Sequence, residues 1–367
     1  MGQAWIAGKP ATLDAAIAAA AKLLHASHCP LIAGLGTDIA GARAAISLAE
    51  RTGAVIDHMN SEAVLRDLDV MRSSGVMLTT PNEAHARADT LLLTGSGLVE
   101  AWPQLQQGLL GPIRHASGII GGERRIYWLC PGRDAAVLEG TAVTALGRDP
   151  NGLPALLAAL RACSAGRPIG NSRIRPKVLN AASTALKAAR FGVAVWSAAA
   201  LDSLAIEMLC GLVSDLNATT RFSGLPLAAG NNAMGVLHAC GWTAGLPMRT
   251  SFARGFAEHD TWLFDGRRLV EHGESDCIVW ISAYGAQSPE WHDAPLAIAL
   301  TDRQSRVRST PHVHIEVGRP GIDHAAVEYA SSFGALAASA ATSATETISV
   351  ADVITRIASN LSGGRAC

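Results

Sequence analysis

The chain has 367 residues, of which 49% are hydrophobic and 17% charged, and its net charge at pH 7 is −1. This length suits two α/β domains, and a near-neutral chain without a basic stripe is a poor candidate for nucleic-acid binding. Residues 15–21 form an apolar run of seven residues, well below the roughly 20 that a membrane span needs. Residues 1–10 lack the pattern of a signal peptide. We therefore expect a non-membrane protein with extensive apolar burial.

The cysteines favour a cytoplasmic location without a cysteine-based metal site. There are seven, scattered along the chain with no CxxC arrangement. Iron–sulfur clusters and structural zinc normally take clustered cysteines. An odd number of cysteines among apolar neighbours suits reduced thiols.

The first part of the chain predicts a β-α-β unit after an alanine-rich helix capped by Thr12. Its strand, helix and second strand are expected at residues 30–35, 39–51 and 54–57. Gly53 stands where a helix C-cap is expected. The first strand runs into Gly34-Leu35-Gly36-Thr37. Ligands of α/β sheets bind at the carboxyl ends of strands, so this turn is a candidate ligand loop.

Helices and strands continue to alternate along the chain, which indicates mostly parallel sheets with helices on both faces. Further strands are expected at 90–94, 125–129, 191–196, 277–282, 295–300 and 312–317, and helices at 155–163, 177–190, 203–217 and 350–361. Residues 61–71 are ambiguous, because they are charged and only weakly helical. Gly95-Ser96-Gly97 is a second strand-end loop. Residues 164–176 are the best linker candidate, residues 220–273 read as irregular, and the small residues of 331–347 read as surface structure.

The glycine loops match known ligand-binding motifs only in part. Gly34-Leu35-Gly36 is half of a dinucleotide fingerprint, because Ile39 stands where the third glycine is required. That glycine lets helix and strand pack closely, so NAD binding is disfavoured. Ser96 lies directly between two glycines, whereas a nucleophile elbow has its glycines two residues away on each side. A strand-end loop is the better interpretation.

His312 and His314 form the best metal-like pair, because residues i and i+2 of a strand share a face. Glu316 continues that face and is the candidate third ligand of a zinc ion. No HExxH motif or second histidine cluster supports such a site. A half-buried strand is the favoured interpretation.

Several segments carry a specific order and spacing along nearly the whole chain. They are PLIAGLG, AAISLAERTGAVID, ARADTLLLTGS, AGNNAMGVLHACGWTAGLPMRTSFARG and VGRPGID. In this arrangement the chain resembles the B subunit of formylmethanofuran dehydrogenases, and within that family the B subunit of the formyltransferase/hydrolase complex of methylotrophic bacteria. The resemblance implies two mostly parallel-sheet α/β domains of the molybdopterin-oxidoreductase type, one inserted in the other, without the N-terminal iron–sulfur domain. The expected domains are residues 1–57 with 166–367, and an inserted 58–165.

Catalytic relatives, the resemblance implies, hold a [4Fe–4S] cluster and a tungsten or molybdenum bis-pterin centre. Here no cysteine precedes Cys29, and the position of the metal-binding thiolate or selenolate falls in Asn60-Ser61-Glu62, whose oxygens are harder ligands. The family's Gly-Ser-Asn-Pro pterin loop reads Gly95-Ser96-Gly97-Leu98, and Cys130 replaces the acidic residue that meets the guanine. The residues of the degenerate loops are Gly34, Gly36, Thr37, Ser61, Glu62, Gly95 and Ser96. We expect no catalytic residue, no cofactor and no metal on this chain.

The leading hypothesis is a non-catalytic scaffold subunit of a formyltransferase/hydrolase complex. The resemblance implies that such a complex passes a formyl group from formyl-tetrahydromethanopterin to a methanofuran-type carrier and hydrolyses it to formate. The expected partners are a transferase, a metallo-hydrolase and a further structural subunit. One alternative is an oxidoreductase that binds a pterin-metal centre through Ser61 or Glu62. Another is a carrier-binding subunit that uses the remodelled cleft and the arginines at positions 249, 254, 267 and 268.

Overall fold

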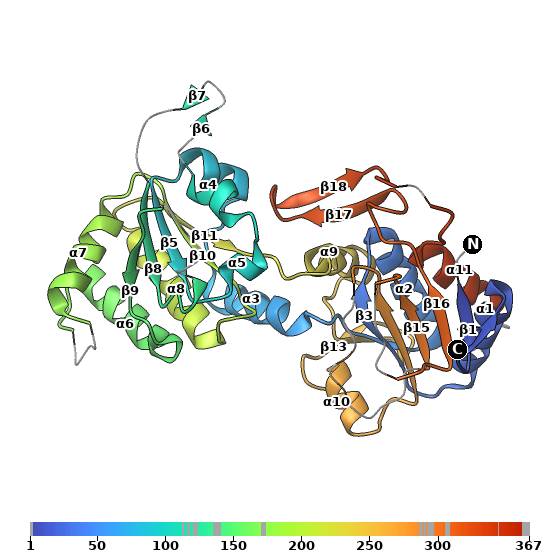
Figure 1. Cartoon of the computed structure of the whole chain (residues 1–367). Helices are drawn as coiled ribbons and strands as arrows, with labels where there is room; N and C mark the ends of the chain where they lie inside the picture. Colours follow the sequence, from blue (N-terminus) through green and yellow to red (C-terminus); the bar gives the residue numbers. More distant parts are fainter. Residues whose placement is uncertain are drawn as a thin grey trace. The chain divides into compact units, whose positions relative to one another are not determined.

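The computed structural model divides the chain into two compact units (Figure 1). The first unit comprises Met1–Leu65, Gly230–Tyr329 and Leu336–Cys367, and the inserted unit comprises Arg66–Ala229 and Ala330–Ala335. The structure describes residues 3–111, 114–115, 118–119, 124–134, 141–169, 174–285, 289, 291, 297–304, 309–343 and 345–361. Among the helices described, none combines the length and the apolarity that a membrane crossing requires.

The first unit is built on a nine-stranded mixed sheet of order β13-β12-β4-β3-β14-β15-β16-β1-β2. Its strands are β1 (Ala4–Ile6), β2 (Lys9–Ala11), β3 (Pro30–Gly36), β4 (Val55–Ile56), β12 (Thr250–Ser251), β13 (Glu258–His259), β14 (Cys277–Ser282), β15 (Ile298–Thr301) and β16 (Val313–Glu316). The central strands from β4 to β16 are parallel, and the outer ones are antiparallel. The parallel centre of the sheet agrees with the mostly parallel sheets that the sequence predicts.

The helices of the first unit are α1 (Leu13–Ala26), α2 (Ile39–Thr52), α9 (Ala233–Ala244), α10 (Gly266–Glu271) and α11 (Val350–Asn360), and α3 (Ser61–Ser74) begins in it. Helices α1, α2, α9 and α11 pack against one another. Helix α10 packs Leu269 against the sheet face that carries Leu31 and Trp280. Local signals start and end two of these helices as expected. Thr12 caps α1, and Gly53 ends α2 in the left-handed conformation that favours glycine.

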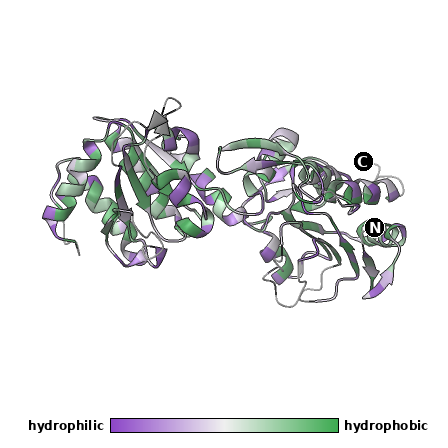
Figure 2. Ribbon diagram, turned by 45° about the horizontal axis from the view of Figure 1, so that its top comes forward, coloured by the Kyte–Doolittle hydropathy of each residue, from purple (hydrophilic) through white to green (hydrophobic). Residues whose placement is uncertain are grey.

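The inserted unit contains a five-stranded parallel sheet of order β11-β10-β5-β8-β9. Its strands are β5 (Thr90–Thr94), β8 (Arg125–Leu129), β9 (Thr144–Leu146), β10 (Gly192–Trp196) and β11 (Phe222–Pro226), and its helices are α4 (Pro81–Arg87), α5 (Leu98–Ala101), α6 (Leu153–Ser164), α7 (Pro176–Lys187) and α8 (Ser203–Leu216). The strands of both sheets are largely hydrophobic (Figure 2). Such runs are typical of parallel strands covered on both faces.

The boundary of the inserted unit differs from the one expected at residues 58–165, because residues 166–229 belong to this unit. Strand β10 pairs with β5, and β11 pairs with β10, so both complete its sheet. Of the expected linker at 164–176, residues 170–173 lie outside the described residues, and the range falls between α6 and α7, which pack against each other. A glycine- and proline-rich connection inside a domain carries the same local signal as a linker between domains.

Two segments contain more regular structure than the sequence indicated. Residues 220–273, expected to be irregular, hold β11, α9, β12, β13 and α10. The stretch expected as small-residue surface structure contributes a strand to the hairpin of β17 (Ala326–Ala330) and β18 (Ala335–Ser339). These elements are short or rich in small residues, so their periodicity is weak.

Candidate functional site

The Gly34 turn is built into the sheet, and Gly34 also borders a polar cavity. Gly34 (φ +81°) and Leu35 (φ +51°) lie within β3, opposite a register irregularity between Trp280 and Ser282 of β14. A Cβ on Gly34 would lie 2.5 Å from the carbonyl oxygen of Ile281. Glycine is required here because two backbones approach closely at a bulge. The close backbone contact is with the neighbouring strand.

The N-terminus of α2 is capped by a carboxylate of the chain itself. The carboxylate of Asp38 accepts a hydrogen bond from the Gly41 N–H at 2.9 Å. Asn232 Nδ2 donates to the carbonyl oxygen of the fully buried Thr37 at 2.8 Å, and its Oδ1 accepts from the Tyr329 N–H at 2.9 Å. Phosphates bind helix N-termini through free N–H groups. The Asp38 carboxylate already occupies that position, so this loop does not fit a diphosphate.

Ser61 and Glu62, at the start of α3, are both engaged in contacts within the first unit. The buried Ser61 hydroxyl accepts a hydrogen bond from the His58 N–H at 3.0 Å. The exposed Glu62 carboxylate pairs with Arg249 at 3.2 Å. Across the described residues, no group of three or more His, Cys, Asp or Glu side chains is placed to share a metal ion.

A polar cavity of about 550 Å³ lies beside these residues, at the carboxyl ends of β3 and β4. It contains an ion cluster, defined as Arg249 with its carboxylate partners. Arg249 lies 2.5 Å from Asp265, 3.2 Å from Glu62 and 3.7 Å from Asp57. Burial raises the pKa of Asp57 to about 6, although Arg249, Ser61 and the Gly266 N–H oppose the rise. No sequence pattern pointed to this cluster, because its members come from distant segments.

His58 lies next to the ion cluster and is buried. Its Nδ1 accepts from the Asn60 N–H at 2.9 Å, so the ring proton lies on Nε2 and is donated to the Asn231 carbonyl oxygen at 3.0 Å. Burial lowers its pKa to about 4. Both ring nitrogens are therefore used, and neither is left for a metal ion or for proton transfer.

The Gly95–Gly97 loop of the inserted unit is likewise filled. Gly95 is left-handed (φ +80°), and a Cβ there would lie 2.5 Å from Leu201 Cδ2. Its carbonyl oxygen accepts from Trp128 Nε1 at 2.8 Å. The carboxylate of Asp134 accepts from the Leu98 N–H at 3.0 Å. The loop that would approach a pterin cofactor is thus packed against an apolar side chain, and a carboxylate of the chain takes its free N–H group. These residues do not fit the cofactor.

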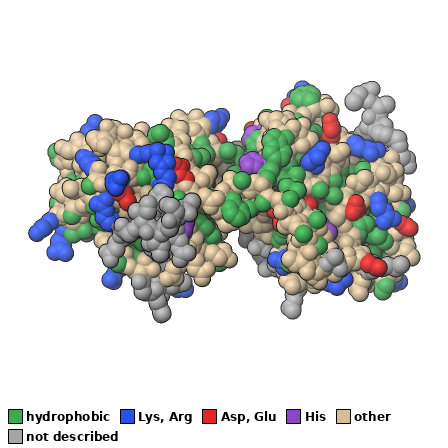
Figure 3. Space-filling model, turned by 90° about the horizontal axis from the view of Figure 1, so that it is seen from above, with side chains coloured by type: hydrophobic (Ala, Val, Ile, Leu, Met, Phe, Trp, Pro, Cys, Tyr) green, Lys and Arg blue, Asp and Glu red, His purple; other side chains and the backbone are tan. Residues whose placement is uncertain are grey.

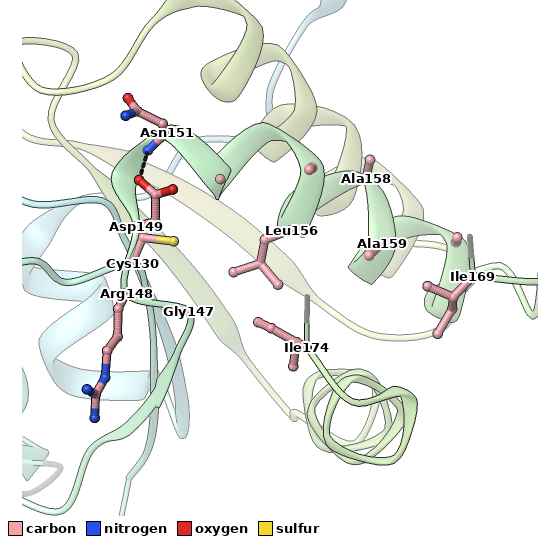
Figure 4. A pocket seen from close by; sticks show the side chains of 13 residues that line it. Cys130, Gly147, Arg148, Asp149, Asn151, Leu156, Ala158, Ala159, Ile169 and Ile174 are labelled. Carbon is pink, nitrogen blue, oxygen red and sulfur yellow. Dashed lines mark hydrogen bonds between the residues drawn. The ribbon is translucent and has the colours of Figure 1, made fainter. Parts of the chain in front are cut away.

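An apolar cavity of about 800 Å³, shown in Figure 4, lies at the carboxyl ends of β8 and β9. It is lined by Cys130, Gly147, Arg148, Asp149, Asn151, Gly152, Ala155, Leu156, Ala158, Ala159, Ala162, Ile169 and Ile174. Cys130 has a left-handed backbone (φ +49°). Burial, and to a smaller extent the negative charge of the nearby Asp149, raises the pKa of its thiol. Cys130 is the position at which the guanine-binding acid is expected in catalytic relatives. The neutral thiol cannot replace a carboxylate in that role.

The histidine pair does not form a ligand set in the structure. His312 is exposed and precedes β16, whereas His314 stacks on Trp5 and shares a hydrogen bond of 2.8 Å with Thr301. Glu316 pairs with Arg303 at 2.6 Å. The half-buried strand is the interpretation that these contacts support.

Each of the four arginines considered for carrier binding has a carboxylate partner of this chain. Arg249 belongs to the ion cluster. The other pairs are Arg254–Glu258 at 2.9 Å, Arg267–Glu271 at 2.7 Å and Arg268–Glu274 at 2.6 Å. A polyanionic ligand would have to compete with these partners, so the arrangement gives the carrier-binding hypothesis no support.

Asp67 of α3 offers a test of the inserted unit. It accepts a hydrogen bond from Trp196 Nε1 at 2.7 Å, and burial raises its pKa to about 6. The raised folded-state pKa gives a stabilising contribution below about pH 4 that is lost as the pH rises through 6. Asp67→Asn should therefore stabilise the unit by roughly 2 kcal/mol at pH 8 and by little at pH 4. Urea unfolding at both pH values checks this, with exposed Asp69→Asn as control. Equal effects at both pH values would contradict it.

The sequence and the fold are both similar to those of known proteins. The chain is 33% identical over 320 residues to the B subunit of the formyltransferase/hydrolase complex Fhc of Methylorubrum extorquens, and the match covers 87% of this chain and 85% of the relative. The chain belongs to the family of Fhc B subunits. It is also 26% identical over 291 residues to the B subunit of the tungsten-containing formylmethanofuran dehydrogenase 2 of Methanocaldococcus jannaschii, covering 77% of this chain and 67% of the relative. No family model matches the chain.

A solved structure confirms the fold class of this member of the Fhc B-subunit family. The crystal structure of the formyltransferase/hydrolase complex (FhcABCD) from Methylorubrum extorquens in complex with methylofuran contains a chain that matches with a TM-score of 0.87. The identity is 33%, and 98% of both chains is covered. The resemblance inferred from the sequence segments is thereby confirmed.

Proposed function

We propose that this chain is a non-catalytic scaffold subunit of a cytoplasmic formyltransferase/hydrolase complex. In that complex a formyl group passes from formyl-tetrahydromethanopterin to a methanofuran-type carrier and is hydrolysed to formate, and the chemistry takes place on other subunits. The similar chain of known structure lies in a four-part complex, FhcABCD, that contains methylofuran. That observation supports both the partners and the carrier.

The filled ligand loops carry the non-catalytic part of the proposal. Asp38 and Asp134 each place a carboxylate on an N–H group at a helix start, which disfavours a cofactor phosphate there, and Leu201 packs against Gly95. Ser61 and Glu62, at the family's metal-ligand position, are bonded to His58 and Arg249. The same contacts weigh against the oxidoreductase alternative.

Exposed apolar side chains support a role in assembly. Figure 3 shows hydrophobic side chains gathered on the visible face of the first unit. The large hydrophobic residues exposed in the described part of the chain are Met77, Leu78, Leu204, Trp242, Phe256, Trp262, Leu263, Ile322, Val327 and Phe333. Aromatic residues that are exposed in the monomer are typical anchors of protein interfaces.

Affinity purification of the tagged chain from its own cells tests the proposal. We expect a transferase, a metallo-hydrolase and a further structural subunit to co-purify, and deletion of the chain to abolish both assembly and formate production. Ser61→Ala with Glu62→Gln should leave the formate production of the complex within about twofold, because neither side chain would touch a reacting group. Tungsten or molybdenum at near-unit stoichiometry on the separated chain, or a large loss of activity in the double variant with assembly intact, would overturn the non-catalytic role.

A further inference from the structure

The apolar cavity of the inserted unit has the size and the position of a small-molecule site. Its volume of about 800 Å³ falls within the range of about 300–1,000 Å³ that is typical of ligand pockets. It lies at the carboxyl ends of two parallel strands, β8 and β9, where α/β sheets bind ligands. None of its lining residues belongs to the ion cluster of the first unit.

Small side chains on one face of α6 create the space. The alanines that line the cavity lie at positions i, i+3, i+4 and i+7, namely Ala155, Ala158, Ala159 and Ala162. The side chains of Leu156, Ile169 and Ile174 line the same space (Figure 4). Because alanine ends at Cβ, this helix face leaves volume that larger residues would fill. The resulting wall is apolar and suits hydrocarbon or ring surfaces.

The two charged side chains at the polar end of the cavity, Arg148 and Asp149, are not directed at the alanine wall. Asp149 accepts a hydrogen bond from the Asn151 N–H at 3.0 Å, as Figure 4 shows, and the Arg148 side chain points away from Leu156. The Cys130 thiol is neutral because burial raises its pKa. A charged ligand placed against the alanines would therefore lose hydration without gaining a partner.

We propose that this cavity binds a neutral, largely apolar small molecule with one hydrogen-bonding group directed toward Cys130 and Asn151. A single side chain of a protein partner would fill only a small part of the volume, whereas a compound of two or three rings matches it. The site is independent of the scaffold role. It is a ligand position in the inserted unit whose chemistry differs from that of a nucleotide-binding cleft.

Binding of the neutral naphthalene dye prodan to the purified complex tests the proposal. We expect saturable binding at one site per chain, weaker binding of the anionic dye 8-anilinonaphthalene-1-sulfonate, and no competition by GMP. Ala159→Trp fills the cavity and should weaken prodan binding at least about tenfold. Ala181→Trp, on an exposed position of α7 outside the cavity, should not.

Cysteine labelling locates the site. The Cys130 thiol is too buried to react readily, so Ala158→Cys is used to place a thiol on the exposed part of the cavity wall. Bound prodan should slow the reaction of N-ethylmaleimide with this introduced thiol, measured by peptide mass spectrometry, and leave that of Cys163 unchanged, because Cys163 does not line the cavity. An unprotected thiol at position 158, prodan binding that survives Ala159→Trp, or competition by GMP would overturn the proposal. Shielding of the introduced thiol by the other subunits in the absence of dye would also overturn it, because a partner segment would then be the occupant.

Discussion

Replacing Arg249 by methionine should lower the free energy of unfolding by roughly 3–5 kcal/mol, because it leaves the buried Asp57 carboxylate without its counter-ion. The Arg249 side chain is 11% exposed and contacts Asp57, Glu62 and Asp265. Its Nη1 also donates to the Thr261 carbonyl oxygen at 2.6 Å. Urea unfolding of the purified chain at pH 8 measures the loss.

Arg254→Met is the matched control. The Arg254 side chain is 70% exposed and pairs with Glu258 four residues away. Such surface pairs contribute at most about 1 kcal/mol. Similar losses in the free energy of unfolding for Arg249→Met and Arg254→Met would contradict the buried ion cluster. Arg249 would then contribute no more than an ordinary surface arginine.

The loss in Arg249→Met should also depend on pH. Burial raises the pKa of Asp57 to about 6, and Arg249 is the first of the groups that oppose the rise. Without Arg249 the pKa rises further, so folded Asp57 takes up a proton more readily. The stabilising contribution of a raised carboxyl pKa is present at low pH and is lost as the pH rises through that pKa. Arg249→Met should therefore be less damaging at pH 5 than at pH 8.

Gly34→Ala should destabilise the first unit by at least about 3 kcal/mol, because the left-handed backbone and the steric contact of the new Cβ each cost free energy. The backbone of Gly34 is left-handed, with φ +81°. Its new Cβ would lie 2.5 Å from the Ile281 carbonyl oxygen, which belongs to the neighbouring strand and cannot rotate away. Guanidinium unfolding measures the change.

Gly53→Ala separates the two penalties. Gly53 is also left-handed (φ +70°), but a Cβ there would first meet Ala253 Cα at 3.4 Å, which is ordinary contact. The free energy of unfolding of this variant should fall only by the cost of the left-handed backbone, about 1 kcal/mol. Equal losses at both positions would show that Gly34 is not closely packed against β14.

Local patterns were sufficient for much of the first unit. The strand that became β3, the helix α2 with Gly53 at its end, and Thr12 at the start of α1 were all readable from a few neighbouring residues. These features depend on apolar period and capping, which act over one or two helical turns. The order of several short segments also identified the family, which the similarity to the Fhc B subunit confirmed.

The division into units depended on contacts that no local pattern contains. Residues 166–229 join the inserted unit because β10 pairs with β5 and β11 pairs with β10. The residues of a strand do not by themselves predict which strand it will pair with, because parallel strands pair through backbone groups common to all sequences. The glycine-rich connection before α7 therefore looked like a boundary.

The role of the loops was likewise set by long-range packing. Gly34 and Gly95 were recognisable from their neighbours as special backbone positions, and the resemblance places both in the degenerate cofactor loops. In the folded chain Gly34 accommodates the backbone of β14, and Gly95 accommodates Leu201. A glycine signals that something approaches closely, and only the folded chain shows what approaches. The family and the local helices and strands could therefore be identified from the sequence alone. The filled loops, the ion cluster and the apolar cavity could not, because each is formed by segments that only folding brings together.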